Sequence, residues 1–318
     1  MTAPILTVTL NPALDVSTRT ARLESQLKLR CEKPAVAPGG GGANVSRMIA
    51  RLGGESHAFV ALGGPTGARW RRLAEAEGLA LLMAEAPGDT RESFQVAIDG
   101  TGDFYRFLLP GPDWAEADGL RLEEALLAHL RGGRYRLLVL SGSLAPGLDP
   151  ALPARLAEAA SELGIATIAD CAGPPLVALL KAPLRVLRLN RRDLAEAARA
   201  LGCEGDPPDD VARAILAGGR IETVLYSLGE AGTAAVGRGA CYRFVPPRVP
   251  VRSLTGAGDS LTGALAFALA RGEDMTEAVR LGVAAAAATA MQPGSNLADP
   301  VDIERLLPRI DVDQSPLR

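Results

Sequence analysis

Residues 254–260 read Leu-Thr-Gly-Ala-Gly-Asp-Ser, and a helical pattern of apolar residues opens directly after them. Glycine permits a tight turn and brings bare amides close to a ligand. A helix N-terminus adds unpaired N–H groups and a partial positive charge, so anions bind there readily. The stretch therefore predicts an anion site at a turn into a helix. Asp259 is either the cap of that helix or a base that removes a proton from an attacking hydroxyl.

A second glycine-rich stretch lies far upstream, where residues 38–44 read Pro-Gly-Gly-Gly-Gly-Ala-Asn. Four consecutive glycines cost backbone entropy unless the backbone must approach something closely. Asn44 is either the cap of the next helix or, with the glycine amides, a grip on a small polar molecule. Residues 9–15, Thr-Leu-Asn-Pro-Ala-Leu-Asp, deliver another acid after a predicted strand. Asp15 either forms an Asx turn or accepts hydrogen bonds from sugar hydroxyls.

Short apolar runs alternate with helical patterns along nearly the whole chain. The predicted strands are 5–10, 58–62, 137–140, 166–169, 184–187 and 223–226. The predicted helices are 44–52, 68–76, 120–130, 150–163, 191–201, 208–217, 259–270 and 276–290. This alternation predicts an α/β fold with a mostly parallel central sheet covered on both faces. Ligands of such sheets gather at the carboxyl ends of the strands, where several polar or glycine-rich loops fall.

Two segments break this pattern and predict a small β-sheet lid. Residues 91–109 read as a hairpin around the turn sequence at 99–103, and residues 16–36 look extended. The return strand, 104–109, is apolar on both phases, which favours pairing with a second subunit to give a homodimer. We therefore expect a single domain over residues 1–310, with lid segments at about 16–36 and 91–110. Residues 311–318 are expected to form a loose tail.

Composition narrows the class of protein. A hydrophobic content of 47% supports a full core, and a net charge of −3 gives no electrostatic case for nucleic acid or an anionic membrane. The start lacks a basic segment before an apolar one, and no uncharged apolar run reaches the length of a membrane span. The four cysteines are scattered, which suits reduced thiols. We therefore expect a cytoplasmic protein that binds small molecules.

Two nucleotide-binding devices are missing from the sequence. Only three lysines occur, and none follows a glycine, so a Walker A phosphate loop is excluded. No Gly-x-Gly-x-x-Gly pattern follows the first strand, which disfavours a nicotinamide-dependent dehydrogenase. The two histidines, His57 and His129, have no partner at metal-ligand spacing.

The two glycine motifs together resemble those of the ribokinase-like (PfkB) family of carbohydrate kinases. Residues 39–47 (GGGGANVSR) and 254–260 (LTGAGDS) carry the resemblance, which extends from Thr9 to about Leu306. The TLNPALD start at 9–15, the SGSLAPG loop at 141–147 and Lys-Leu-Arg-Cys at 28–31 resemble the phosphofructokinase branch. Members that act on fructose 1-phosphate or tagatose 6-phosphate usually carry a Lys in the first motif. The all-glycine run is similar to the minor, PfkB-type 6-phosphofructokinases.

The resemblance implies a ribokinase-like three-layer sandwich and transfer of the γ-phosphoryl group of ATP to the C1 hydroxyl of fructose 6-phosphate. Asp259 is then the base, and the amides around Gly256, Ala257 and Gly258 form the anion hole. Loss of the base should cost about 10²–10⁴-fold in rate. Tagatose 6-phosphate and fructose 1-phosphate remain alternative substrates. A catalytically silent sugar-phosphate sensor remains the alternative that is not an enzyme.

The resemblance also implies the contacts to the sugar phosphate. Hydroxyl groups are expected to meet Asp15, Gly39, Gly40 and Asn44. The 6-phosphate is expected to meet Lys28, Arg91 and Ser143. Arg30 is a further candidate, contributed across a dimer.

The nucleotide contacts implied by the resemblance are Arg188, Asn190, Ser227, Gly229 and Gly232. Mg²⁺ is expected near Asn190 and, through water, Asp193. Asp193 is one methylene shorter than the Glu of the family's Asn-x-x-Glu motif, and Arg188 stands where the branch usually has a Lys, which exchanges a compact ammonium for a planar fork. The family further implies a monovalent cation such as K⁺, held mostly through backbone carbonyls around Ser253, Thr255, Thr289, Gln292, Gly294 and Asn296.

Overall fold

Seven parallel strands form the centre of a ten-stranded sheet in the computed structural model, which describes residues 4–237 and 239–316. In spatial order they are β11 (Ile221–Ser227), β10 (Leu184–Asn190), β9 (Ala166–Asp170), β8 (Leu137–Ser141), β1 (Ile5–Thr9), β4 (Ser56–Leu62) and β5 (Ala80–Glu85). The antiparallel strands β12 (Thr233–Gly237), β13 (Ala240–Val245) and β14 (Asp311–Pro316) extend the sheet beyond β11. The predicted mostly parallel sheet is confirmed.

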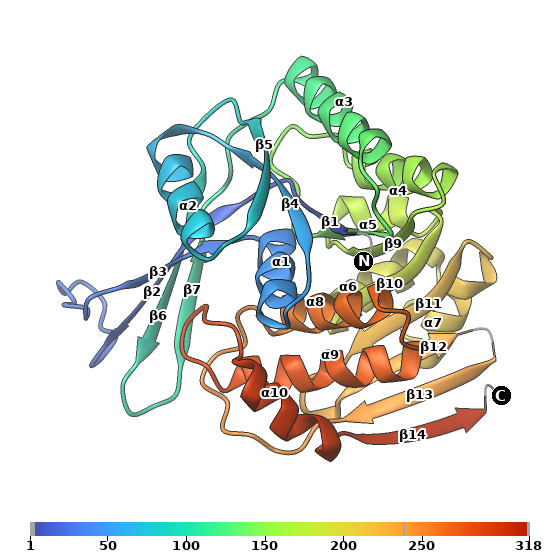
Figure 1. Cartoon of the computed structure of the whole chain (residues 1–318). Coiled ribbons are helices and arrows are strands. Elements are labelled where there is room, and N and C mark those ends of the chain that lie inside the picture. Colours follow the sequence, from blue (N-terminus) through green and yellow to red (C-terminus); the bar gives the residue numbers. More distant parts are fainter. Residues whose placement is uncertain (1–3, 238, 317–318) are drawn as a thin grey trace.

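Helices cover both faces of this sheet and give three layers (Figure 1). One face carries α1 (Gly41–Arg51), α8 (Ala257–Ala270), α9 (Met275–Ala290) and α10 (Pro300–Leu306), which pack on strand residues such as Ile5 and Val139. The other face carries α3 (Glu116–Gly132), α4 (Leu152–Glu162), α5 (Pro174–Leu179), α6 (Arg191–Leu201) and α7 (Pro208–Ala217), with Leu6 and Leu138. Because alternate strand residues enter two separate cores, the sheet is buried on both sides.

A separate four-stranded sheet stands beside this body (Figure 1). Its order is β3 (Ala35–Gly39), β2 (Ala13–Thr20), β6 (Arg91–Ile98) and β7 (Phe104–Leu108). The hairpin predicted at 91–109 is confirmed, with β6 and β7 antiparallel around two glycines of positive φ. Helix α2 (Gly64–Ala76) packs between the two sheets, where Trp70 is fully buried beside Leu14 and Val60. We call this four-stranded sheet the lid.

The expectation of a loose tail was wrong for residues 311–316. They form β14, which pairs with β13 along its whole length. The segment is polar and lacks an apolar period, but an edge strand needs only backbone hydrogen bonds to its neighbour. Residues 317–318 lie outside the described residues. Strands β5, β12 and β13 and the short helices α5 and α10 were also not predicted.

The glycine runs let helices approach strands and other helices closely. A Cβ atom added at Gly41 would lie 2.5 Å from Ser141 Oγ, and one at Gly42 would lie 2.7 Å from Thr9 Oγ1. Helix α8 is similarly close to α1, since a Cβ at Gly263 would lie 2.8 Å from the Cβ of Met48. The backbone at residues 39–42 therefore does approach other groups closely, as expected. At Gly41 and Gly42, however, these groups belong to the protein itself.

Two further observations bear on the class of protein. All four cysteines are free, as expected for reduced thiols. Within residues 4–237 and 239–316, every helix is too short or too polar to cross a bilayer.

Candidate active site

The two glycine motifs meet through their polar residues. Asn44, near the start of α1, donates a hydrogen bond from Nδ2 to Asp259 Oδ2 at 2.8 Å. Both residues lie at the edge where the parallel strands end, next to the loops after β1 and β8. The sequence placed both motifs at this edge, and the structure brings them into direct contact.

The start of α8 is open to an anion. Gly256 precedes the helix with a left-handed backbone (φ 79°), and no side chain caps the helix. Ala257 N donates to Leu254 O at 3.3 Å, whereas the amides of Gly258 and Asp259 have no acceptor within the described part of the chain. The interpretation of Asp259 as a helix cap was therefore wrong, and two N–H groups remain for a ligand.

Burial raises the pKa of the Asp259 carboxyl to about 6. The negative charge of Asp170 raises it further, while the Asn44 hydrogen bond and the positive charges of Arg188 and Arg106 oppose the rise. A carboxylate with such a pKa is ionised at neutral pH and binds a proton more readily than an ordinary aspartate. It is therefore suited to act as a general base.

Arg188 lies directly against the proposed anion hole. A Cβ added at Gly258 would lie 2.9 Å from its Nη2. Arg188 Nη1 donates to Asp170 Oδ1 at 3.2 Å, and Thr262 Oγ1 donates to Asp170 Oδ2 at 2.9 Å. Sequence reasoning missed Asp170, although it ends a buried strand just as Asp15 follows β1. Asp170 holds the guanidinium group in place beneath Gly258.

The lid and the first glycine motif form the side of the site that is predicted to bind the sugar. Asp15 on β2 is buried and packs against Gly39, where any Cβ would overlap its carboxyl group. Burial raises the pKa of Asp15, and the charges of Arg106 and Arg91 oppose this. Gly40 precedes α1 with φ 119°, a conformation that favours glycine.

A second polar cluster surrounds Asn11. Arg91 donates from Nη2 to the Asn11 carbonyl oxygen at 3.1 Å and from Nη1 to Leu109 O at 3.3 Å. Asn11 Nδ2 in turn donates to Ser143 Oγ at 3.2 Å. Asn11 therefore joins Arg91 and Ser143, the two residues predicted to contact the 6-phosphate.

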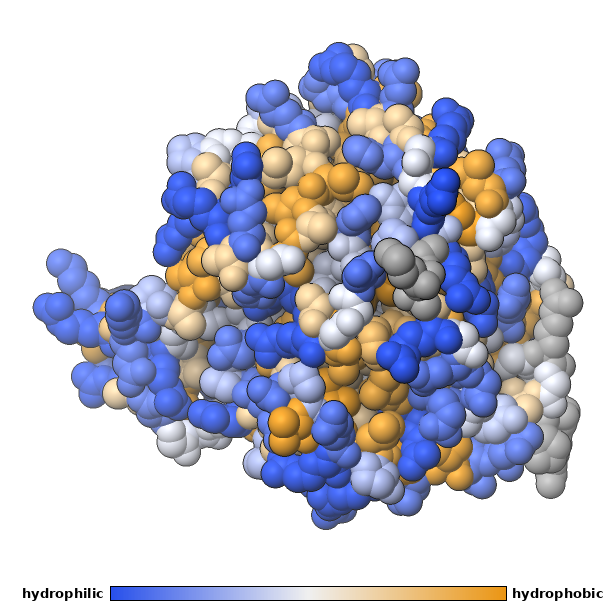
Figure 2. Space-filling view, viewed as in Figure 1, coloured by the Kyte–Doolittle hydropathy of each residue, from blue (hydrophilic) through white to orange (hydrophobic). Residues whose placement is uncertain are grey.

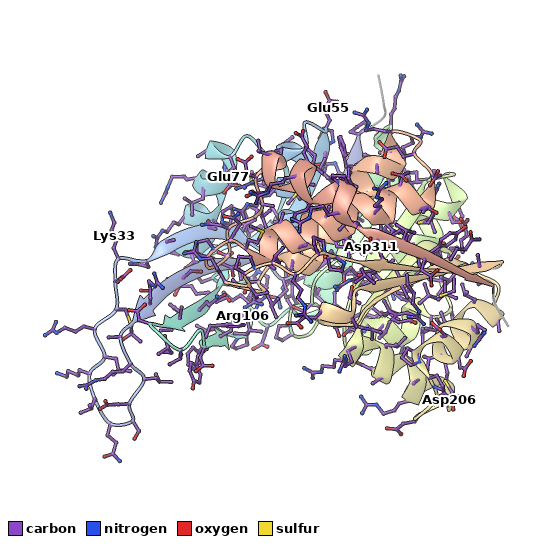
Figure 3. The ribbon with its side chains drawn as sticks, turned by 90° about the horizontal axis from the view of Figure 1, so that it is seen from below. Lys33, Glu55, Glu77, Arg106, Asp206 and Asp311 are labelled. Carbon is purple, nitrogen blue, oxygen red and sulfur yellow. The ribbon has the colours of Figure 1, made fainter. Side chains whose placement is uncertain are left out.

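Arg106 belongs to the same side of the site but was not predicted. The strand register pairs it with Gln95, two residues from Ser93, which pairs with Asp15. These residues share one face of the lid because alternate residues of a strand point the same way. Figure 3 shows Arg106 where the lid meets the body, with Lys33 beyond the outer end of β3. The residues on both sides of Arg106 fit the pattern of an apolar hairpin strand, so no motif singled out this arginine as a site residue.

The structure does not bring Lys28 or Arg30 to this cluster within one chain. Both are exposed in the loop between β2 and β3, which projects from the body at the left of Figure 1. From Asp15 to Thr20, strand β2 already carries the chain about 17 Å away from the site.

The predicted nucleotide residues lie after β10 and β11. Asn190 and Asp193 form a capping box at the start of α6. Asn190 Oδ1 accepts from Asp193 N at 3.0 Å, and Asp193 Oδ2 accepts from Asn190 N at 3.1 Å. Ser227 Oγ is 3.2 Å from Thr233 Oγ1, and Gly229 and Gly232 have positive φ in the turn between β11 and β12.

The part of the chain that the structure describes holds no group of three or more His, Cys, Asp or Glu side chains that could bind a metal by themselves. Asp193 nevertheless lies close enough to Asp170 to interact with it electrostatically. Burial raises the pKa of Asp193, and the negative charge of Asp170 raises it further. Mg²⁺ is usually held by one or two carboxylates together with substrate phosphates and water. These residues fit that arrangement.

The predicted cation loops are tied together and to the lid. Gln95 on β6 is buried; its Nε2 donates to Ser253 Oγ at 3.2 Å, and its Oε1 accepts from Thr255 Oγ1 at 2.6 Å.

The other residues predicted around the cation also make contacts of their own. Thr289 Oγ1 donates to Ser260 Oγ at 2.8 Å, and Gln292 Nε2 donates to Asp302 Oδ2 at 3.3 Å. Gly294 has positive φ and packs on Ser17 of the lid, and Asn296 N donates to Pro293 O. Since the side chains of Ser253, Thr255, Thr289 and Gln292 are engaged, a K⁺ ion here fits backbone carbonyls better.

This chain is similar to known proteins over most of its length. The model of the pfkB family of carbohydrate kinases matches residues 9–302. The chain is 37% identical over 306 residues to the ATP-dependent 6-phosphofructokinase isozyme 2 of Escherichia coli, covering 95% of this chain and 97% of that relative.

Two crystal structures of phosphofructokinase-2 from Escherichia coli match the whole fold. The structure in complex with potassium gives a TM-score of 0.88, and the structure in complex with fructose-6-phosphate gives 0.86. Each is 35% identical to this chain and covers 96% of it and 99% of the solved chain.

Proposed function

Because the chain belongs to the pfkB family of carbohydrate kinases, we propose that it transfers the γ-phosphoryl group of ATP to the C1 hydroxyl of fructose 6-phosphate. The observation that carries this proposal is the placement of Asp259. It is half-buried at an uncapped helix start and hydrogen-bonded to Asn44, and desolvation of its carboxyl raises the pKa to about 6. A sugar hydroxyl beside this carboxylate meets a base and an anion site at once.

The reaction follows from these positions. Asp259 takes the proton of the C1 hydroxyl as the hydroxyl oxygen forms a bond to the γ-phosphorus. The bond from the γ-phosphorus to the bridging oxygen breaks, and ADP leaves with that oxygen. The amides after Gly256 and the guanidinium of Arg188 stabilise the charge on the moving group, and the products are fructose 1,6-bisphosphate and ADP.

The residues around Asn11 and Arg106 are suited to the rest of the substrate. Arg91, Arg106 and Ser143 supply two positive charges and a hydroxyl for the 6-phosphate. Asp15, Gly39, Gly40 and Asn44 supply acceptors and amides for the ring hydroxyls. The 6-phosphofructokinase isozyme 2 of Escherichia coli, a close relative by sequence and fold, supports fructose 6-phosphate over tagatose 6-phosphate or fructose 1-phosphate. A silent sensor is disfavoured because Asp259 and the open amides are both present.

We assign the nucleotide to the loops after β10 and β11, at Arg188, Asn190, Ser227, Gly229 and Gly232. Mg²⁺ is assigned to the phosphates and, through water, to Asp193 beside Asn190. When bound, it neutralises negative charge on the phosphates. K⁺ is assigned to the carbonyls around Ser253, Thr255, Thr289, Gln292, Gly294 and Asn296.

We also propose that the body and lid act as a single kinase domain over residues 1–310, and that two copies pair through their lids. All five residues of β7 are exposed, including Phe107 at 53% and Leu108 at 58%. Figure 2 shows hydrophilic residues at the projecting tip, so the apolar strand is the better candidate for pairing.

A coupled assay of ADP release tests this function directly. Purified protein with MgATP should release ADP with fructose 6-phosphate, and less efficiently with tagatose 6-phosphate or fructose 1-phosphate. A preference for fructose 1-phosphate would overturn the substrate but not the reaction. No release with any of the three would overturn the kinase function.

A further inference from the structure

Arg47 is a buried arginine behind the active site, on the same helix as Asn44. Its side chain is 2% exposed. Nε and Nη2 donate to the two carboxylate oxygens of Glu77, at 2.6 and 2.9 Å. Glu77 follows directly after α2, and Figure 3 labels it beside the helices of the body. The guanidinium is thereby fixed by a two-pronged bond, the strongest arrangement for an arginine and a carboxylate.

The third donor of Arg47 points to the site. Its Nη1 donates to Asn44 Oδ1 at 3.0 Å, while Asn44 Nδ2 donates to Asp259 Oδ2 at 2.8 Å. Hydrogen bonds therefore run without a break from Glu77 through Arg47 and Asn44 to Asp259.

This arrangement dictates which way the Asn44 amide faces. A guanidinium group can only donate, so the amide atom that meets Arg47 must be the oxygen. The NH₂ group is then left facing Asp259, where an ionised carboxylate can accept its hydrogen bond. If the amide were reversed, its oxygen would face the carboxylate and its NH₂ group would face another donor. Both contacts would be repulsive.

We propose that Arg47, clamped by Glu77, is a positioning residue that orients the Asn44 amide so that its NH₂ group holds Asp259 ionised and aimed at the sugar hydroxyl. The inference rests on the proposed function, because it requires Asp259 to be the base. A purely structural role, joining α1 to α2, would use only the two donors that meet Glu77.

Other charged groups also face Asp259. Asp170 at the end of β9 disfavours the ionised form, and Arg188 on β10 and Arg106 on β7 favour it. Asn44 is the neighbour that α1 contributes.

Arg47 itself influences Asp15 by its charge, and it reaches Asp259 through the amide. Two substitutions separate these effects. Arg47→Met removes both the charge and the donors. Arg47→Lys keeps the charge, but a single ammonium cannot replace three donors in a planar fork.

The test is the pH dependence of kcat/KM for fructose 6-phosphate. In wild type the acid limb should lie near pH 6. Loss of the oriented hydrogen bond removes a contact that favours the ionised form, so the pKa of Asp259 rises. In Arg47→Met and Arg47→Lys the limb should therefore move up by about one pH unit. In an Asn44→Ala background, Arg47→Met should shift the limb no further, because its effect passes through the amide.

Arg155→Met is the matched control. Arg155 makes the same two-pronged bond to Glu123, at 2.7 and 2.7 Å, between α4 and α3. Its loss should leave the acid limb in place. If Arg47→Met does not fold, Glu77→Gln loosens the clamp and should give a smaller shift in the same direction.

The inference is overturned if the Arg47 variants lose rate or stability but keep the wild-type limb, or if the shift persists in the Asn44→Ala background. A wild-type limb in Arg47→Lys alone would also overturn it, since charge would then suffice. If wild type releases no ADP with any sugar phosphate, the proposed function fails first and this inference falls with it.

Discussion

Replacing Gly258 with Ala tests whether catalysis or the stability of the fold requires a glycine at this position. The added Cβ would lie 2.9 Å from Arg188 Nη2 and 3.2 Å from Cζ. The guanidinium must then retreat by about half an ångström to reach an ordinary contact distance. Asp170 holds it on the other side at 3.2 Å, so the retreat also disturbs that pair.

The effects on stability and on rate should differ. Gly258 has ordinary helical φ, and alanine favours a helix over glycine by about 1 kcal/mol. This gain offsets the cost of moving Arg188, so the melting temperature should change by only a few degrees. Displacement of the Arg188 guanidinium from the transferring phosphoryl group should lower kcat by about 10- to 100-fold. Coupled ADP release at saturating fructose 6-phosphate and a thermal melt measure the two quantities.

Gly263→Ala, one and a half turns further along α8, is the matched control. Its Cβ would lie 2.8 Å from the Cβ of Met48 and 2.9 Å from the Val45 carbonyl oxygen, both of which belong to α1. This variant should lose stability but keep the kcat of the folded enzyme. Wild-type kcat in Gly258→Ala, or an equal loss of kcat in Gly263→Ala, would refute the role of Gly258.

Three further predictions follow from the site and the lid. Between about pH 5 and 7, kcat/KM should rise with pH as Asp259 ionises around pH 6; a flat profile would argue against a base of raised pKa. Gln95→Leu, which cuts the bonds to Ser253 and Thr255, should raise KM for fructose 6-phosphate several-fold and weaken activation by K⁺, as measured against tetramethylammonium; unchanged values would show that the lid and cation loop are independent. Phe107→Asp should yield monomers in light scattering, and a wild-type mass would exclude pairing through β7.

The strand-end residues of the site could be predicted because the physics that places them is local. An acid after a buried parallel strand must lie at one edge of the sheet, and Asp15, which follows β1, obeys this rule. Asn44 and Asp259 follow the antiparallel strands β3 and β13, and their glycine motifs singled them out instead. Asp170, at the end of β9, satisfies the same rule, but the sequence around it contains no further motif that would have marked it as a site residue. The motif alone left cap and base both open at Asp259, and the structure excludes the cap because no side chain caps α8.

Other features depend on contacts between distant segments. Arg106 reaches the site only because β7 pairs with β6, which itself pairs with β2. Strand β14 exists because β13 offers a free edge, and its own sequence gives no strand pattern. Lys28 was grouped with Arg91 on motif resemblance, yet the length of β2 separates them within one chain. None of these relations can be derived from local propensity.

The Asp259→Asn variant tests the central claim most directly. It should reduce ADP release with fructose 6-phosphate by at least about 10²-fold across all pH values. It should also melt no lower than wild type at pH 8. Burial raises the folded-state pKa of Asp259 from 3.8 to about 6, so the wild-type protein loses stability as pH rises through this range and the carboxyl ionises. The Asn variant has no charge to bury at this position and does not lose this stability. A loss of rate with an intact fold is the predicted result; appreciable turnover in this variant would contradict the account.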